Sequence, residues 1–199
     1  MPSTHKPLSA LADYQHWLST IKQRVVSARL RVALAANSEL IALYYEIGAR
    51  IVERETHTQW GSGFIDAFSK DLRQAFPDIG GFSSKNLRYC RAFFRFYCAP
   101  AIWQQAVAKL AETPWPGVDG ALAEQLGQIP WGHNIHIFTK CGSIEEARFY
   151  IAQTLEQGWS RDVLAMQIKS RLHARSGKAV SNFTRTLPAP QSDLAQQTL

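Results

Sequence analysis

Apolar residues recur at helical spacing along most of this chain, whereas alternating β-type segments are few and no hairpin signal is convincing. This pattern predicts an all-α fold. The longest apolar seam, with alternating steps of three and four residues, consists of Leu11, Tyr14, Leu18, Ile21, Val25, Ala28, Val32 and Ala35. After Asn37 the phase shifts and a stripe continues through Leu40, Tyr44, Ile47 and Ile51. The long N-terminal helix therefore either runs on to about Thr56 or breaks at Asn37 and folds back.

The next two helical patterns form a helix-turn-helix outline. Residues 62–76 have apolar positions at helical spacing, and Pro77 in the following PDIGG sequence disfavours continuation of that helix. Ser83 is a good N-cap for a second helix over residues 82–97, whose apolar arc consists of Leu87, Cys90, Phe94 and Tyr97. In a DNA-binding helix-turn-helix the second helix enters the major groove. The fold predicted for the central region is therefore a helix-turn-helix or winged-helix-like helical domain.

Charge strengthens this interpretation, because the chain carries a net charge of +6 and much of the excess lies in one segment. No carboxylate occurs between Asp78 and Glu112, a span that contains Lys85, Arg88, Arg91, Arg95 and Lys109. Such a segment attracts polyanions. The candidate base-reading residues, near the start of the helix, are Ser84, Lys85, Asn86 and Arg88, and the candidate phosphate contacts are Arg91 and Arg95. The competing interpretation is a basic helix face that is only solvated, and the flanking aromatic residues Tyr89, Phe93 and Phe96 are expected to pack against another helix rather than to stack on bases.

A second helix-turn-helix outline follows the loop at residues 111–121. Residues 143–172 contain the capping box of Ser143 and Glu146, a stop at Gly158 and a further N-cap at Ser160. Cations are again concentrated in the second half, where Arg161, Lys169 and Arg171 are added to the candidate DNA contacts. The predicted division is a helical dimerisation segment over residues 1–58, a DNA-binding-like domain over residues 59–175, and a polar linker or tail over residues 176–199.

Catalytic chemistry is hard to find in this sequence. His133 and His136 could share a helix face, but no cysteine or carboxylate at ligand spacing accompanies them, so a surface or capping role is the default over a zinc site. No phosphate loop, dinucleotide fingerprint or nucleophile elbow occurs, and no acidic-x-Lys element accompanies Asp78. Three widely spaced cysteines suit reduced thiols, and neither a membrane span nor a signal peptide is apparent. We therefore predict a cytoplasmic protein without catalytic activity of its own and without cofactor or metal.

Several segments resemble the N-terminal domain of the YhcG-type family of bacterial proteins. These are LIALYYEIGARIVER (40–54), WGSGFIDAFSKDLRQAFPDIGGFSSKNLRYCRAFFRFY (60–97), IPWGHN (129–134) and ARFYIAQTLEQGWSRDVLAMQI (147–168). The resemblance implies a helical, winged-helix-like DNA-binding domain that is followed by a nuclease domain of the PD-(D/E)xK type. The family's catalytic residues have no counterpart positions in this sequence, so none is carried over.

These observations together predict a DNA-binding and self-association module that lacks a nuclease site of its own. Its partners would be duplex DNA and a second copy bound through the helix at Leu11–Ala35. The alternative is an interaction module whose long seam docks a nuclease or restriction-system partner while the basic face keeps the chain soluble. RNA binding through the same cationic face is a third interpretation.

Overall fold

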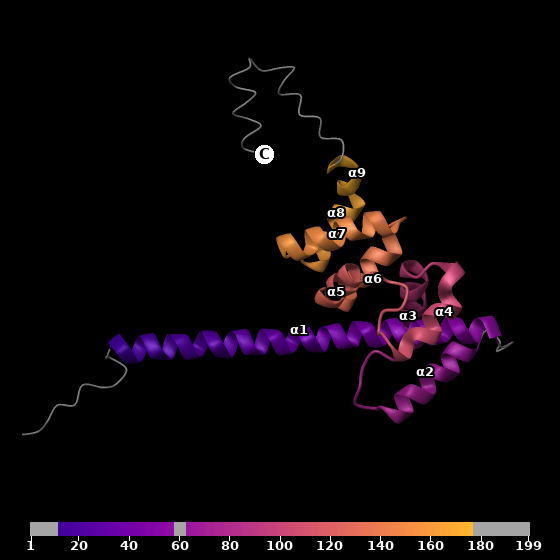
Figure 1. Cartoon of the computed structure of the whole chain (residues 1–199), viewed down its shortest axis with the longest axis horizontal. Helices are drawn as coiled ribbons and strands as arrows, with labels where there is room; N and C mark the ends of the chain where they lie inside the picture. Colours follow the sequence, from indigo (N-terminus) through magenta and orange to yellow (C-terminus); the bar gives the residue numbers. More distant parts are fainter. Residues whose placement is uncertain (1–11, 58–62, 177–199) are drawn as a thin grey trace, which may run out of the picture.

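The fold is all-α, as predicted, and begins with one very long helix. The computed structural model describes residues 12–57 and 63–176, and within these ranges it contains no β-strand. Helix α1 runs without interruption over Ala12–His57, so the predicted alternative of a break at Asn37 does not occur. Figure 1 shows the first half of α1 as an arm that projects from a body formed by the other helices. Leu11, the first residue of the predicted seam, and the tail from residue 177 onward lie outside the described residues.

Asn37 stays helical because its side chain has partners in the body. Its Nδ2 donates to the carbonyl oxygens of Gly127 and Ile129, at 2.6 and 3.1 Å, where another helix ends. Carbonyl groups at a helix end lack partners within the helix, so the amide satisfies the Gly127 acceptor, and it shares the Ile129 acceptor with Nδ2 of Asn134. Gly127 also lies directly against Ser38, since a Cβ atom at Gly127 would be 2.5 Å from the Ser38 hydroxyl. The phase shift in the sequence therefore marks where α1 leaves solvent and enters the body.

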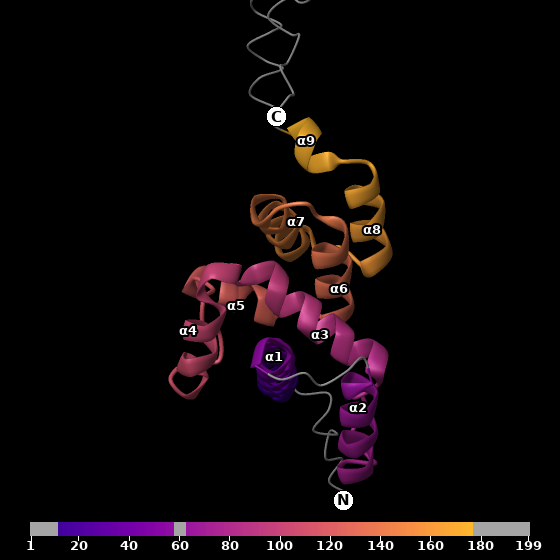
Figure 2. The ribbon, with the colours of Figure 1, turned by 90° about the vertical axis from the view of Figure 1, so that its right-hand side faces the viewer.

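The body is a stack of short helices built upward from α1, as Figures 1 and 2 show. Helices α2 and α3 flank the second half of α1. The helices that follow form layers at increasing distance from α1, and α9 is the most distant. The remaining elements are α2 (Phe64–Ala75), α3 (Ser84–Tyr97), η2 (Pro100–Ile102), α4 (Trp103–Ala108), η3 (Lys109–Ala111), α5 (Gly120–Gln128), α6 (Trp131–Lys140), α7 (Ile144–Gln157), α8 (Arg161–Lys169) and α9 (Leu172–Ser176). The connection between α2 and α3, residues 76–83, is longer than the turn of about 3–4 residues in a DNA-binding helix-turn-helix.

The predicted capping residues have their expected roles. The side chains of Ser83, Ser143 and Ser160 each accept a hydrogen bond from a backbone amide in the first turn of α3, α7 and α8. Gly158 ends α7 in the left-handed conformation, with φ of 62°, which costs glycine little. Local sequence therefore determines these helix ends.

The core lies between α1 and α3 and continues into α5, α6, α7 and α8. All four apolar residues predicted for the inner face of α3 are buried, and Phe93, which lies off that arc, is buried as well. Phe93 contacts Tyr45 of α1 and Trp131 of α6, with ring centroids 5.8 and 5.2 Å apart. As predicted, Tyr89 and Phe96 pack against the same core. Because α3 has neighbours on several sides, the aromatic residues outside its apolar arc also pack within the body.

Helices α1 and α3 cross at a glycine. A Cβ atom on Gly48 would lie 2.1 Å from the carbonyl oxygen of Cys90 and 3.0 Å from Cβ of Phe94. Both neighbours belong to the middle of α3 and are fully buried, so neither can move away without shifting the helix. Only glycine permits this crossing distance.

We predict that Gly48→Ala destabilises the body. The added methyl group meets backbone rather than a flexible side chain, so the free energy of unfolding should fall by about 1–3 kcal/mol or more. Thermal or urea unfolding followed by circular dichroism measures this change. Gly120→Ala is the matched control, because no atom lies within 4 Å of a Cβ there. That variant should be neutral or slightly more stable, and an equal loss in both variants would contradict a special role for the crossing.

Candidate nucleic-acid interface

The cationic face of α3 is largely neutralised by carboxylates from other helices. Nη2 of Arg88 donates to both carboxylate oxygens of Asp66 in α2, at 3.0 and 3.1 Å. Arg91 and Arg95 share Glu55 of α1, at 2.6 and 2.7 Å. The lack of carboxylates between residues 78 and 112 in the sequence is therefore not a lack of carboxylates around α3. These are partly exposed ion pairs, which contribute little to stability and can exchange partners.

Two of the predicted base-reading residues have structural partners inside the body. Nδ2 of Asn86 donates to the carbonyl oxygen of Gly81 at 2.6 Å, and its Oδ1 accepts from Nε1 of Trp131 at 2.7 Å. Ser84 donates to Asp66, and this bond, together with the Arg88 guanidinium, holds the pKa of that carboxyl below its usual range. Asn86 thus ties the turn before α3 to the start of α6, a connection between residues 45 positions apart.

Lys85 is the α3 cation for which the described residues provide no ion pair. Its side chain is exposed, and Nζ lies 5.9 Å from the ring centroid of Tyr89. A cation over an aromatic ring keeps its charge and its capacity to donate to a further ligand. Of the residues predicted on this helix, Lys85 is therefore the one best placed to meet an external anion.

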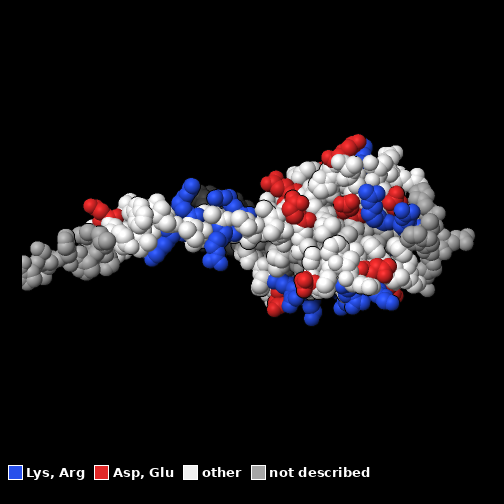
Figure 3. Space-filling view, turned by 90° about the horizontal axis from the view of Figure 1, so that it is seen from below, with Lys and Arg blue, Asp and Glu red and all other residues white. Residues whose placement is uncertain are grey.

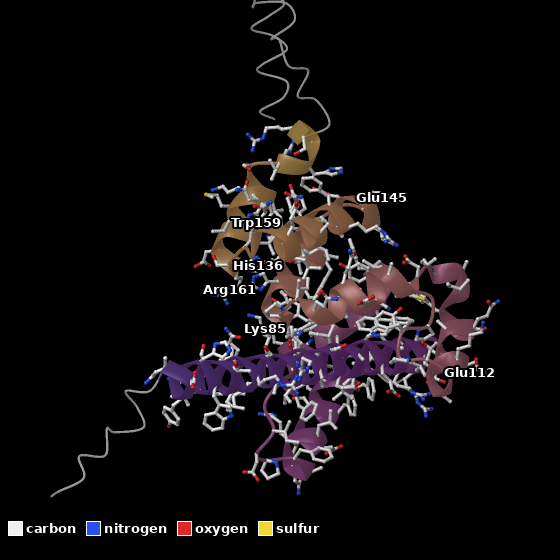
Figure 4. All side chains as sticks on the ribbon, turned by 60° about the vertical axis from the view of Figure 1, so that its left-hand side comes forward. Lys85, Glu112, His136, Glu145, Trp159 and Arg161 are labelled. Atoms are coloured by element: carbon white, nitrogen blue, oxygen red, sulfur yellow. The ribbon has the colours of Figure 1, made fainter. Side chains whose placement is uncertain are left out.

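The start of α3 lies beside the starts of α6 and α8. The Asn86–Trp131 hydrogen bond joins α3 to α6, and the ring Nε2 of His133 lies 2.9 Å from the carbonyl oxygen of Trp159, just before α8. Arg161 packs over Gly132, where a Cβ would be 3.5 Å from its Cδ. In Figure 4 Lys85, Arg161, His136 and Trp159 follow one another on the same side of the body, above the arm. We call this region the amino-terminal patch and define it as Lys85, Gly132, His133, His136 and Arg161.

The electrostatics of the amino-terminal patch favour an anion. Helix N-termini present unpaired amide N–H groups and the positive end of the helix dipole, and three of them meet here. Arg161 has only a long contact of 3.9 Å with Asp162, and both side chains are more than half exposed. The two cations of the patch are therefore available to a phosphate group.

The structure does not gather all the predicted contacts into one place. Lys169 and Arg171 lie at the opposite end of α8 from Arg161, and both are exposed. Arg88, Arg91 and Arg95 follow α3 away from its N-terminus toward Glu55 near the end of α1. Of the predicted DNA-contacting cations, only Lys85 and Arg161 belong to the amino-terminal patch. They come from two separate basic segments of the sequence.

A set of cations on the arm was not among the predicted contacts. Residues 14–38 contain Lys22, Arg24, Arg29 and Arg31 and no carboxylate, and all four cations are exposed. Figure 3 shows their blue side chains along the arm, while the body carries both colours intermixed. This segment shares with α3 the sequence signal of clustered cations without a carboxylate.

The potential metal ligands and thiols of the described residues are scattered or buried. No group of three or more potential metal-ligating side chains occurs there, and His133 is engaged with Trp159. Cys90, Cys98 and Cys141 are free and buried, and burial raises the pKa of each thiol, so none is activated as a nucleophile. No helix in this part of the chain has both the length and the apolar character needed to cross a membrane.

Comparison with known proteins assigns the class. Residues 20–175 of this all-α chain match the family described as DUF1016 N-terminal domain. The chain belongs to that family. It is 30% identical over 179 residues to a protein of Escherichia coli (strain K12) named "Putative nuclease YhcG". The match covers 83% of this chain and 47% of the relative, so the chain spans about half the length of that protein. No solved structure matches the chain.

We predict that Asn86→Ala lowers stability rather than removing a base contact. The substitution leaves the partly buried Trp131 indole and the Gly81 carbonyl without their partner, which costs about 1–3 kcal/mol. Urea unfolding followed by tryptophan fluorescence measures the loss. The neighbouring variant Lys85→Ala is the control and should unfold nearly like wild type, because Lys85 is exposed and its contact is that of a cation 5.9 Å from the centroid of the Tyr89 ring. Equal stability of the Asn86→Ala variant and wild type would contradict the structural role.

Proposed function

We propose that this chain is the nucleic-acid-binding module of a nuclease, that it binds duplex DNA through the amino-terminal patch, and that it is not catalytic by itself. The observation that carries the proposal is the position of Lys85 and Arg161. Both cations lack a close carboxylate partner among the described residues and lie where the N-termini of α3, α6 and α8 meet. Phosphate groups are bound by cations and helix N-termini in this manner.

The other candidate residues have secondary roles in this proposal. Arg88, Arg91 and Arg95 extend the contact along α3 by exchanging exposed carboxylate partners for phosphates, an exchange that costs only about 0–1 kcal/mol per pair. Lys169 and Arg171, at the far end of α8, contact the phosphate backbone of the DNA. Ser84 and Asn86 position the start of α3 through their internal hydrogen bonds. Contacts of this kind give affinity and orientation more than sequence preference.

The family supports the nuclease context but not a cleavage site in this chain. The relative is named as a nuclease, and this chain corresponds to about half of it. We therefore assign cleavage to a partner or to a further domain. A cytoplasmic location is part of the proposal, because free buried thiols and duplex DNA are both found in that compartment.

The second function proposed from the sequence is association with another protein through α1. The specific observation that favours it is the arm, whose apolar side chains are uncovered in the single chain. The homodimer predicted through Leu11–Ala35 remains a prediction.

We predict that DNA binding depends steeply on salt and that the amino-terminal patch carries part of that dependence. If Lys85 and Arg161 each neutralise one phosphate, then Lys85→Ala and Arg161→Ala should each flatten the slope of log K against log salt by about 0.9. Fluorescence anisotropy with a labelled DNA duplex at several salt concentrations measures the slope. The slope of the double variant should flatten by about twice as much as that of either single variant.

The control for this titration is Lys140→Ala. Lys140 is an exposed cation at the other end of α6, so its removal changes the net charge equally but leaves the patch intact. It should leave the slope near the wild-type value. If the slope flattened equally in all three single variants, the effect would be due to net charge alone and not to the patch. An unchanged slope in both patch variants would contradict the proposal. An RNA duplex of matched sequence tests the RNA interpretation.

We predict that the purified chain leaves plasmid DNA intact in the presence of Mg²⁺ or Mn²⁺. Hydrolysis assisted by Mg²⁺ or Mn²⁺ needs a cluster of oxygen ligands, mainly carboxylates, and the described residues contain no group of three or more possible metal ligands. Gel electrophoresis of supercoiled plasmid is the measurement. Cleavage that survives purification and is lost on mutation of Asp66 or Asp78 would contradict this prediction.

A further inference from the structure

The arm of α1, residues 12–36, exposes an unusual amount of apolar surface. Its described side chains are exposed except those of Tyr14 and Leu18, which are half-buried. Val25 is 51% exposed and Val32 is 70% exposed, and the other large apolar side chains with more than 40% exposure are Trp17, Ile21, Val26, Leu30 and Leu34. A helix of this composition is ordinarily covered by a partner.

The longest apolar stripe of the arm has the geometry of a coiled-coil seam. Leu18, Val25 and Val32 occupy a positions, and the d positions are Tyr14, Ile21, Ala28 and Ala35. Around Ala28 and Val32 the surface forms a shallow groove bordered by Arg29, since the small alanines leave room for a neighbouring helix. The seam therefore fits a second helix packed alongside.

Cations border this seam on both sides. At 100° per residue Lys22 and Arg29 fall at the e positions along one edge, and Arg24 and Arg31 fall at the g positions along the other. None of the four has an ion pair within the described residues. They contrast with the α3 arginines, which are matched to Glu55 and Asp66 by the chain itself.

This charge pattern disfavours pairing of two identical arms. In a parallel pair, g and e positions five residues apart face each other, so Arg24 of one copy would lie opposite Arg29 of the other. In an antiparallel pair g positions face g positions, and arginine again meets arginine. Because residues 14–38 contain no carboxylate, no register of two arms along this stretch creates an ion pair. Like charges at these positions select against a partner.

We propose that the arm docks an acidic amphipathic helix of a separate partner protein, with apolar residues at a and d and carboxylates at e and g. The apolar half of that helix covers the seam, and its carboxylates meet the four cations on both edges. Nucleic acid satisfies only the cations and would leave Val25 and Val32 in water, so it fits the arm less well. This inference goes beyond the proposed function and does not depend on the amino-terminal patch.

The test uses two designed peptides of about four heptads, a length sufficient for a stable coiled coil. Both have Ile at a and Leu at d, one has Glu at every e and g position, and the other has Lys there. Binding of each fluorescent peptide to the full chain is followed by anisotropy. We expect the acidic peptide to bind at least about tenfold more tightly than the basic one. Absence of binding, or equal binding of both peptides, overturns the proposal.

Two variants of the chain separate the seam from its charges. The variant with Lys22, Arg24, Arg29 and Arg31 all replaced by Glu should exchange its preference and bind the basic peptide. Ile21→Ser combined with Val25→Ser should weaken the acidic peptide at least about tenfold with the charges unchanged. Both changes lie outside the body, so its thermal unfolding should be unaltered. Retention of the acidic peptide by the charge-reversed chain contradicts the proposal.

Two further measurements exclude other occupants. Analytical ultracentrifugation of the wild-type chain should show a monomer in the absence of peptide, whereas a dimer lost in the Ile21→Ser, Val25→Ser variant identifies a second copy as the occupant and overturns the proposal. A DNA duplex should bind the Ile21→Ser, Val25→Ser variant as tightly as it binds wild type. It should also fail to displace the acidic peptide from the wild-type chain at moderate salt. Displacement by DNA identifies nucleic acid as the ligand of the arm and also overturns it.

Discussion

The close crossing of α1 and α3 at Gly48 is the constraint on which the rest of the structure depends. Because the two backbones approach so closely, Phe93 and Phe94 of α3 reach Tyr45 of α1, and the core forms around this contact. The hydroxyl of Tyr45 donates to the carbonyl oxygen of Pro116 at 2.9 Å, which fixes the long connection before α5. Further along α1, Asn37 and Ser38 receive the end of α5. A single helix thus serves as the base for every later layer.

Placement of α3 at the centre changes what its arginines can do. A helix that is packed on α1, α2 and α6 exposes only a narrow strip, and Glu55 and Asp66 lie at the edges of that strip. The one α3 cation without an ion pair among the described residues, Lys85, lies at the start of the helix, where Asn86 and Trp131 connect α3 to α6. The proposed binding of a polyanion is therefore placed where three helices begin, since there the helix dipoles and the charges of Lys85 and Arg161 would act in the same direction.

Two halves of α1 experience different environments although both carry apolar stripes. From Ile41 to Val52 the helix is largely buried on one side, because α3 and α5 cover it. Before Asn37 nothing in the described body covers it, and its cations have no ion pair with any described residue. An apolar seam bordered by a single sign of charge specifies a complementary surface of opposite charge, since self-pairing would place like charges together. The two proposals therefore assign different kinds of recognition to the body and to the arm of one helix.

The sequence by itself determined the helical class, a helix over the apolar seam that ends at Ala35, the caps at Ser83, Ser143 and Ser160, and the apolar face of α3, because each depends on side chains within a few residues of one another. It also showed which segments, residues 14–38 and 79–111, contain no carboxylate. It could not show that Arg88, Arg91 and Arg95 are neutralised, because Asp66 and Glu55 are 22 to 40 positions away and are brought to α3 only by packing. Nor could it show whether α1 breaks at Asn37, since that depends on two carbonyl groups some 90 residues later. Tertiary structure decided which charges are satisfied within the chain and which remain for a partner, because ion pairing depends on distance in space rather than on separation in sequence.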